Sequence, residues 1–468
     1  MVILAMLFLY FEGFIFRFGG NSYTYYYILM IFLLFLSYIF FCGKHFLVKL
    51  KFLYLKTPFK YLVYFIAWLF IDAIILILTQ KATILIFYYI VVKLLIPAMI
   101  CYMISSVFIP KYISLKFAIR LLLLFMFGFI CLGFIGFIGD TFNISFFQSI
   151  VNSISNLKEL MVGGDTLFDA TSGSARARSV FHEPGSFAKY ILLISPIVYK
   201  ICLSKYKIFK NNFCNCFFKY TLIPLSLICV ILTKSPIFFI FMFIFLISYF
   251  YKNILFLLKK YFILISLFCI YIILFLINTS VFLEKTYLAR IFTTIKNMND
   301  FYSFVILEPS LASRVVSYIN SFLLFLQKPF IGYGIDNVRF YMTQQFLNSP
   351  VPLTFENIDL LKDALVTSQG TGYNKSLLTC LLSETGLIGT GLYFLFLYKH
   401  IKYIDKLKIY FTGIEEKFLD GLKFTIIIVI ISSFYIYSFA TSYLYLYYGF
   451  VCSFVTQYYL NKRKEVLK

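Results

Sequence analysis

The feature that most constrains the fold of this chain is the recurrence of apolar runs about 20 residues long, of which residues 115–139 are one example. A helix of that length crosses a bilayer core of about 30 Å. The composition agrees, because 62% of the 468 residues are hydrophobic and 13% are charged. A soluble domain has about 45–50% apolar and about 25% charged residues. We therefore predict an all-α, polytopic helical membrane protein in which residues 1–468 form a single membrane domain.

The apolar runs indicate about twelve transmembrane helices. Most are separated by short, lysine-dense segments such as residues 43–60 and 205–219, and positive charge of this kind favours the cytoplasmic side. The two long connections, residues 140–185 and 280–375, then both lie outside, and the N- and C-termini lie in the cytoplasm. The expected spans are residues 1–16, 24–42, 61–79, 83–108, 115–139, 186–204, 220–233, 235–252, 260–279, 376–398, 422–440 and 442–460.

The charge balance and the cysteines argue against several classes of protein. The net charge of +22 is concentrated in the predicted cytoplasmic loops, so it indicates topology and not binding to nucleic acid. The predicted external connections contain no cysteine, so no structural disulfide is expected, and Cys214 and Cys216 fall in a predicted cytoplasmic loop. No phosphate-binding loop, dinucleotide fingerprint or metal-ligand spacing is present, so neither a metal nor a cofactor is predicted. Asp72 and Lys93, both inside predicted spans, are either a structural pair or a functional one.

A polar stretch, Arg176–Tyr190, ends the first external connection, after a predicted interfacial helix over residues 144–161. Pro184 is tolerated in the first turn of a helix, so we predict that the next span begins near Gly185. The amides of that first turn would then face the external surface. A helix N-terminus beside arginines is a suitable binding site for an anion.

The second external connection is too long to lack structure of its own. We predict a helix that is capped by Ser310 or Ser313 and ends at Gln327, followed by a tight turn over Pro329–Gly334. The polar segment that continues to Thr371 is interpreted as a lid. The helix should lie on the membrane or among the external ends of the bundle. Its predicted apolar face is formed by Val315, Val316, Ile319, Phe322, Leu323 and Leu326.

The arginines of the two connections are candidates for binding phosphate, because a guanidinium group contacts phosphate oxygens through two parallel hydrogen bonds. At an external membrane surface they suit a lipid-linked pyrophosphate; alternatively, they only anchor lipid headgroups. His182 or Glu183 could take a proton from a sugar hydroxyl, or Glu183 could fix an arginine in a salt bridge. The candidate pyrophosphate ligands are Arg176, Arg178, Arg314 and Arg339.

Three segments, taken in order, resemble one known family, the O-antigen and capsule polymerases (Wzy-type) with their O-antigen ligase relatives. The first, Arg176-x-x-Ser179-x-Phe181-x-Glu183-Pro184-Gly185-Ser186-Phe187-Ala188, resembles R-x-x-G-x-F-x-E-P-(N/S/G)-x-x-A, with serine where glycine is usual. The second is Ser313-Arg314 followed by Pro329-x-x-Gly332-x-Gly334, similar to an arginine helix before P-x-x-G-x-G. The third, Tyr373-Asn374-x-x-Leu377 with Glu384-x-Gly386-Leu387-Ile388-Gly389, resembles H-N-x-x-L…E-x-G-x-x-G.

This resemblance implies a metal-independent, inverting, GT-C-like glycosyltransferase on the periplasmic face of a bacterial inner membrane. Its donor would be the growing glycan on undecaprenyl pyrophosphate, and its acceptor one lipid-linked repeat unit. It implies catalytic roles for Arg176, Arg314 and either Glu183 or His182, with the active site formed by both external connections. Substrate positioning would fall to Tyr373, Asn374 and Glu384. Further partners would be membrane lipid, a chain-length regulator and a flippase.

Two alternatives stay open beside the polymerase. An O-antigen ligase would transfer the glycan to lipid A–core, but its motif has histidine at the position of Tyr373, which favours the polymerase. A polysaccharide flippase or transporter, which is not an enzyme, also has about twelve helices. The two long external connections argue against the transporter, because its loops are usually short.

Overall fold

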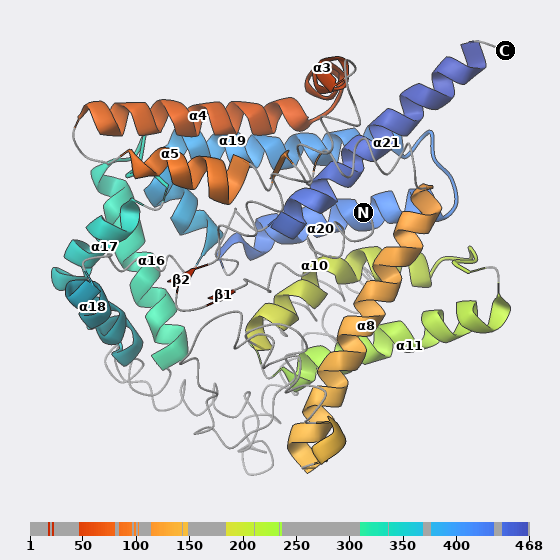
Figure 1. Ribbon diagram of the computed structural model, residues 1–468, viewed down its shortest axis with the longest axis horizontal. Helices are drawn as coiled ribbons and strands as arrows, with labels where there is room; N and C mark the ends of the chain where they lie inside the picture. The colour runs from red at the N-terminus through yellow and green to blue at the C-terminus, as the bar shows by residue number, and fades with distance from the viewer. Residues whose placement is uncertain are drawn as a thin grey trace, which may run out of the picture.

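The computed structural model describes a helical protein whose elements run in several directions (Figure 1). The described residues are 17–18, 21–22, 46–79, 84–95, 98–99, 102, 114–142, 144–147, 184–209, 211–233, 235, 309–335, 337–367, 376–434 and 442–466. Two short strands, β1 (Arg17–Phe18) and β2 (Asn21–Ser22), pair antiparallel. The helices are α3 (Phe46–Lys56), α4 (Phe59–Leu78), α5 (Leu85–Tyr89) with the π-helix η2 (Ile90–Leu95), α8 (Leu115–Phe142), α10 (Pro184–Cys202), α11 (Asn212–Leu232), α16 (Pro309–Gln327), α17 (Val338–Leu347), α18 (Phe355–Thr367), α19 (Leu377–Leu407), α20 (Ile414–Ile431) with the 3-10 turn η5 (Ser432–Phe434), and α21 (Ser442–Val466).

Four of the described helices, α4, α8, α11 and α19, are long and apolar enough to cross a membrane. The predicted helical fold is confirmed, these four apolar helices support a membrane protein, and α10, α20 and α21 are helical where further spans were predicted. Residues 1–16, 24–42, 236–252 and 260–279 lie outside the described residues. The number of spans and their orientation therefore stay predictions.

Helix α11 begins earlier than predicted, at Asn212 instead of residue 220. The Asn211 side chain caps it by accepting a hydrogen bond from the Phe213 amide at 2.8 Å. Asn215, one turn later, accepts a hydrogen bond from the Ile208 amide at 2.7 Å and holds the preceding loop against the helix. Cys214 and Cys216 therefore lie in the first turns of a helix, and their assignment to a loop was wrong.

The closest helix pairing joins α10 to α20. Pro196 cannot donate to the Leu192 carbonyl one turn earlier, and the Ser195 hydroxyl bonds that oxygen instead, at 3.1 Å. Across the interface, the Thr425 hydroxyl donates to the Leu193 carbonyl at 2.8 Å. A side chain at Gly421 would lie 2.3 Å from the Ile197 Cα atom, so only glycine permits this approach.

Helices α16, α17 and α18 stand at the end of the bundle where α4 ends and α19 begins (Figure 1). The described part of the second long connection is therefore folded, with two helices between residues 338 and 367, and the interpretation of the segment to Thr371 as a lid stays a prediction. The three helices pack together around a small apolar core of their own, which sequence periodicity in such short helices does not reveal. This core consists of Val316, Leu324, Tyr333, Val338, Met342, Phe346 and Leu361.

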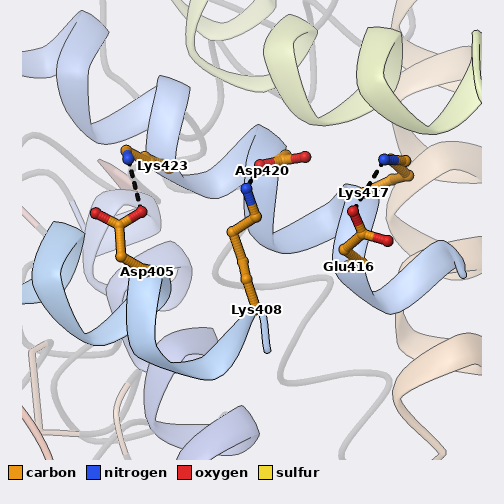
Figure 2. A network of polar contacts seen from close by, with 6 residues as sticks. All are labelled: Asp405, Lys408, Glu416, Lys417, Asp420 and Lys423. Carbon is orange, nitrogen blue, oxygen red and sulfur yellow. Dashed lines mark hydrogen bonds and ion pairs between the residues drawn. The ribbon is translucent and has the colours of Figure 1, made fainter. Parts of the chain in front are cut away.

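Charged side chains gather at the opposite end, where α19 turns into α20 (Figure 2). The Lys423 ammonium lies 2.6 Å from the Asp405 carboxylate, Lys408 pairs with Asp420, and Lys417 pairs with its neighbour Glu416. From Gly386 to Leu407 the helix rises roughly 30 Å at 1.5 Å per residue. The two ends of α19 therefore differ in chemistry, one enclosed by helices and the other covered by ion pairs.

Candidate functional site

The centre of the candidate site is a break in α19 at Gly386, whose backbone has φ 65° and ψ −170°. Only glycine occupies this region without strain, so two helical segments meet here instead of one continuous helix. Carbonyl groups just before the break and amide groups just after it cannot bond along the helix. In a membrane span such groups need partners within the protein.

The turn that follows α16 supplies most of these partners. The Tyr333 and Gly334 amides donate to the carbonyls of Ser383 and Glu384 at 2.9 and 2.8 Å. In return, the carbonyls of Pro329 and Phe330 accept from the amides of Leu387 and Ile388 at 2.8 and 3.4 Å. The Trp68 indole of α4 donates to the Thr385 carbonyl at 3.2 Å. We call this interlocked pair of segments, Pro329–Gly334 and Ser383–Gly389, the clasp.

The glycine spacing of the clasp has a steric cause. A Cβ atom on Gly332 would lie 2.6 Å from the Glu384 carbonyl carbon, and one on Gly386 would lie 2.2 Å from the Phe330 oxygen. A Cβ atom on Gly389 would come within 2.9 Å of the Trp68 ring. The segments with the P-x-x-G-x-G and E-x-G-x-x-G patterns therefore pack backbone against backbone, with Gly332 in one segment and Gly386 in the other.

Helix α4 lines the clasp with one face. Asp72 follows Trp68 by one turn on that face, and its side chain is buried. One turn further, the Leu76 side chain occupies the space that a Cβ atom on Gly334 would need. The opposite charge that acts on Asp72 is Lys328, the residue before the turn. The predicted partner Lys93 has a side chain outside the described residues.

Lys328 is enclosed by aromatic rings. Its ammonium lies 4.0 Å from the ring centre of Tyr333 and 5.1 Å from that of Tyr341, close enough for cation–π attraction. The Tyr333 hydroxyl donates to the Gln327 side chain at 2.7 Å. Burial raises the pKa of Tyr333 above its usual value, so this hydroxyl stays protonated at neutral pH and can donate the bond.

The structure does not bring the predicted arginines Arg314 and Arg339 together. Arg314, half-buried, is the sixth residue of α16, roughly 21 Å along the axis from Lys328. Arg339, in α17, lies near the other end of α16. Tyr341 of α17 contacts Lys328, which directly follows α16. The Arg339 guanidinium donates to the Tyr89 hydroxyl at 2.8 Å and so connects α17 to α5. This bond gives Arg339 a positioning role that the sequence did not indicate.

Most of the other predicted site residues cannot be located. Arg176, Arg178, His182, Glu183, Tyr373 and Asn374 lie outside the described residues. Pro184 is the first residue of α10 among those described, so the prediction of a helix from about Gly185 is confirmed. Glu384 is buried immediately before the break, and its backbone carbonyl belongs to the clasp.

Sequence reasoning missed Trp68, Tyr333 and Lys328 as parts of this site. Trp68 is the one tryptophan of the chain, which was a signal, but nothing in its apolar surroundings indicated a contact with α19. The proposed caps were also wrong. Helix α16 begins at Pro309, which suits a first turn, so Ser310 and Ser313 lie inside it.

Comparison of the chain with protein-family models, with curated proteins and with solved structures finds no match. Within the described ranges, no three His, Cys, Asp or Glu side chains gather in a way that could hold a metal ion. What the site offers chemically is a backbone contact between two segments, the buried Asp72 side chain, the partly buried Lys328 side chain and the half-buried guanidinium of Arg314.

Proposed function

We propose that this protein is an inverting glycosyltransferase of a bacterial cytoplasmic membrane, with about twelve spans, two external connections and cytoplasmic termini. It would join undecaprenyl-pyrophosphate-linked repeat units into a surface polysaccharide, either O-antigen or capsule. The acceptor sugar hydroxyl attacks the anomeric carbon of the donor, and the pyrophosphate leaves with the electron pair of the broken bond. The hydroxyl proton passes to Glu183 or His182.

The observation that supports this proposal is the clasp. Two segments that resemble the polymerase family, Pro329–Gly334 and Glu384–Gly389, are about 50 residues apart in the chain and interlock through backbone hydrogen bonds. Two of their glycines, Gly332 and Gly386, are required by that contact. The glycine spacing that carries the resemblance therefore has a structural role in this chain, which supports the proposal.

The arginines have the charge that this reaction needs. Negative charge grows on the departing pyrophosphate, and a fixed guanidinium stabilises it most when water is excluded. Arg314 is half-buried in a helix that ends directly at the clasp. In the proposal, Arg314 and the arginines that precede α10 bind the two pyrophosphates. Arg339, bound to Tyr89, supports them indirectly by fixing α17.

Deletion of the gene, followed by gel analysis of the surface glycan, tests the proposal. Loss of a polymerase should leave lipid A–core that carries a single repeat unit. Polymer that stays on the lipid carrier would instead indicate a ligase. Single lipid-linked units confined to the cytoplasmic face would indicate a transporter, and an unchanged glycan would contradict all three functions.

The transporter deserves one comparison, because the break in α19 favours it. Transporters commonly form their substrate sites from interrupted membrane helices. In this protein, however, Trp68 and the Pro329–Gly334 turn occupy the backbone groups at the break. The interruption of α19 thus forms contacts with α4 and with the turn after α16. These contacts favour the glycosyltransferase proposal over the transporter.

The proposed reaction needs neither metal nor nucleotide, because the pyrophosphate leaving group already carries the free energy for transfer. Purified protein with lipid-linked repeat units should form polymer in the presence of EDTA and without ATP. Activity that disappears with EDTA and returns with magnesium would contradict this part of the proposal.

A further inference from the structure

Helix α16 buries a row of polar residues beside apolar ones such as Val316 and Leu324. Its buried face carries the polar residues Ser313, Ser317, Asn320 and Ser321, which are at most 1% exposed. Two large apolar side chains on other faces are open, with Phe322 47% and Leu326 55% exposed. The predicted apolar face was therefore only partly correct, since Val316 is buried but Phe322 and Leu326 point outward.

The buried polar face is satisfied by the neighbouring helices. The Asn320 amide donates to the Ser349 hydroxyl at 3.1 Å, and the Asn357 amide donates to the Ser317 hydroxyl at 3.4 Å. The Ser317 hydroxyl donates to the Ser313 carbonyl at 2.7 Å. Small and hydrogen-bonding residues inside, with large apolar residues outside, are typical of helices that associate within lipid.

The open apolar side chains continue onto the surface of the membrane helices. Phe330 in the clasp is 64% exposed, and its carbonyl is bonded to the amide of Ile388, which is 41% exposed. Leu387 beside it is 48% exposed, and Leu78 at the end of α4 is 78% exposed. Exposed apolar side chains are thus found on α4, on α19 and on the turn that follows α16.

The other two helices of this unit also expose apolar side chains; Lys362 of α18 is exposed as well, and its long side chain can extend to the lipid headgroups. Phe355 and Leu365, near the two ends of α18, are 74% and 56% exposed, and Leu347 at the end of α17 is 52% exposed. We propose that the α16–α18 unit is immersed in the lipid layer, with Phe322, Leu326 and Phe355 in contact with acyl chains. The unit is therefore not a water-exposed loop domain. This proposal is independent of the glycosyltransferase.

Tryptophan fluorescence in brominated lipid tests the proposal, because the chain has one tryptophan, Trp68. In a Trp68→Phe background, Phe322→Trp or Phe355→Trp is introduced and the protein is placed in vesicles with bromine on the acyl chains. Bromine quenches only tryptophans that it contacts. Ile409→Trp is the matched control, because Ile409 is 80% exposed but lies beside the ion pairs between α19 and α20.

Both test positions should be quenched by bromolipid more strongly than position 409, and should resist acrylamide in the water. Quenching by acrylamide and not by bromolipid would overturn the proposal in favour of a water-exposed surface. Quenching by neither reagent would overturn it in favour of a protein partner or a second copy. If the Trp68→Phe protein does not fold, the same comparison is made with Trp68 retained and its signal subtracted. No measurement depends on transferase activity.

Discussion

Replacement of Gly386 by alanine should destabilise the protein through the clasp. The added Cβ atom would lie 2.2 Å from the Phe330 oxygen and 2.6 Å from the Ile331 nitrogen, and both are backbone atoms that cannot rotate away. Alanine at this backbone conformation costs about 1–3 kcal/mol. If the turn moves away, the hydrogen bonds from Leu387 and Ile388 are lost, at about 0.5–1.5 kcal/mol each. We expect a loss of about 2–6 kcal/mol in the free energy of unfolding.

Gly391→Ala is the matched control. Gly391 lies in the same helix, and a Cβ atom added there would meet no neighbouring atom within 4 Å. That substitution should leave stability unchanged or raise it by up to about 1 kcal/mol. The assay is thermal unfolding in detergent, followed by fluorescence of Trp68, whose indole is bonded to Thr385 inside the clasp. Unfolding of a membrane protein is often irreversible, so half-lives at one temperature are compared. Equal half-lives for the two variants would refute the reasoning.

Three further outcomes follow. Asp72→Asn and Lys328→Gln should each lower stability, but the double variant should lose less than their sum, with a coupling of about 0.5–3 kcal/mol; strict additivity would contradict a direct charge interaction. Arg314→Lys should reduce polymer formation by a factor of about 100–1,000 at normal protein levels, and near-normal polymer would favour a headgroup anchor. A cysteine at Ser172 should react with an impermeant thiol reagent in spheroplasts, whereas one at Lys406 should not; the reverse pattern would invert the topology.

Composition and the positions of turn residues were sufficient to predict the helical architecture. Continuous apolar runs located α4, α8 and α19, because only backbone-satisfied helices are stable in lipid. Turn residues also placed two boundaries well: the start of α10 at Pro184 and the end of α16 at Gln327.

The arrangement of the site was not predictable, for two physical reasons. The break at Gly386 lies inside an apolar run, and its backbone angle depends on a turn about 50 residues earlier in the chain. The inward face of α16 was missed because Ser317 and Asn320 are polar, and apolar periodicity does not place polar residues inside. Both are buried because residues of the neighbouring segments hydrogen-bond them.

Gly421 of α20 restricts how α10 and α20 can move relative to each other. With Gly421 lodged against the backbone at Ile197, α10 can neither slide nor rotate along α20 without a collision. The first turn of α10, from Pro184, is thereby held at a fixed position relative to α20. A group bound at that turn would keep the same register to α20 throughout a reaction.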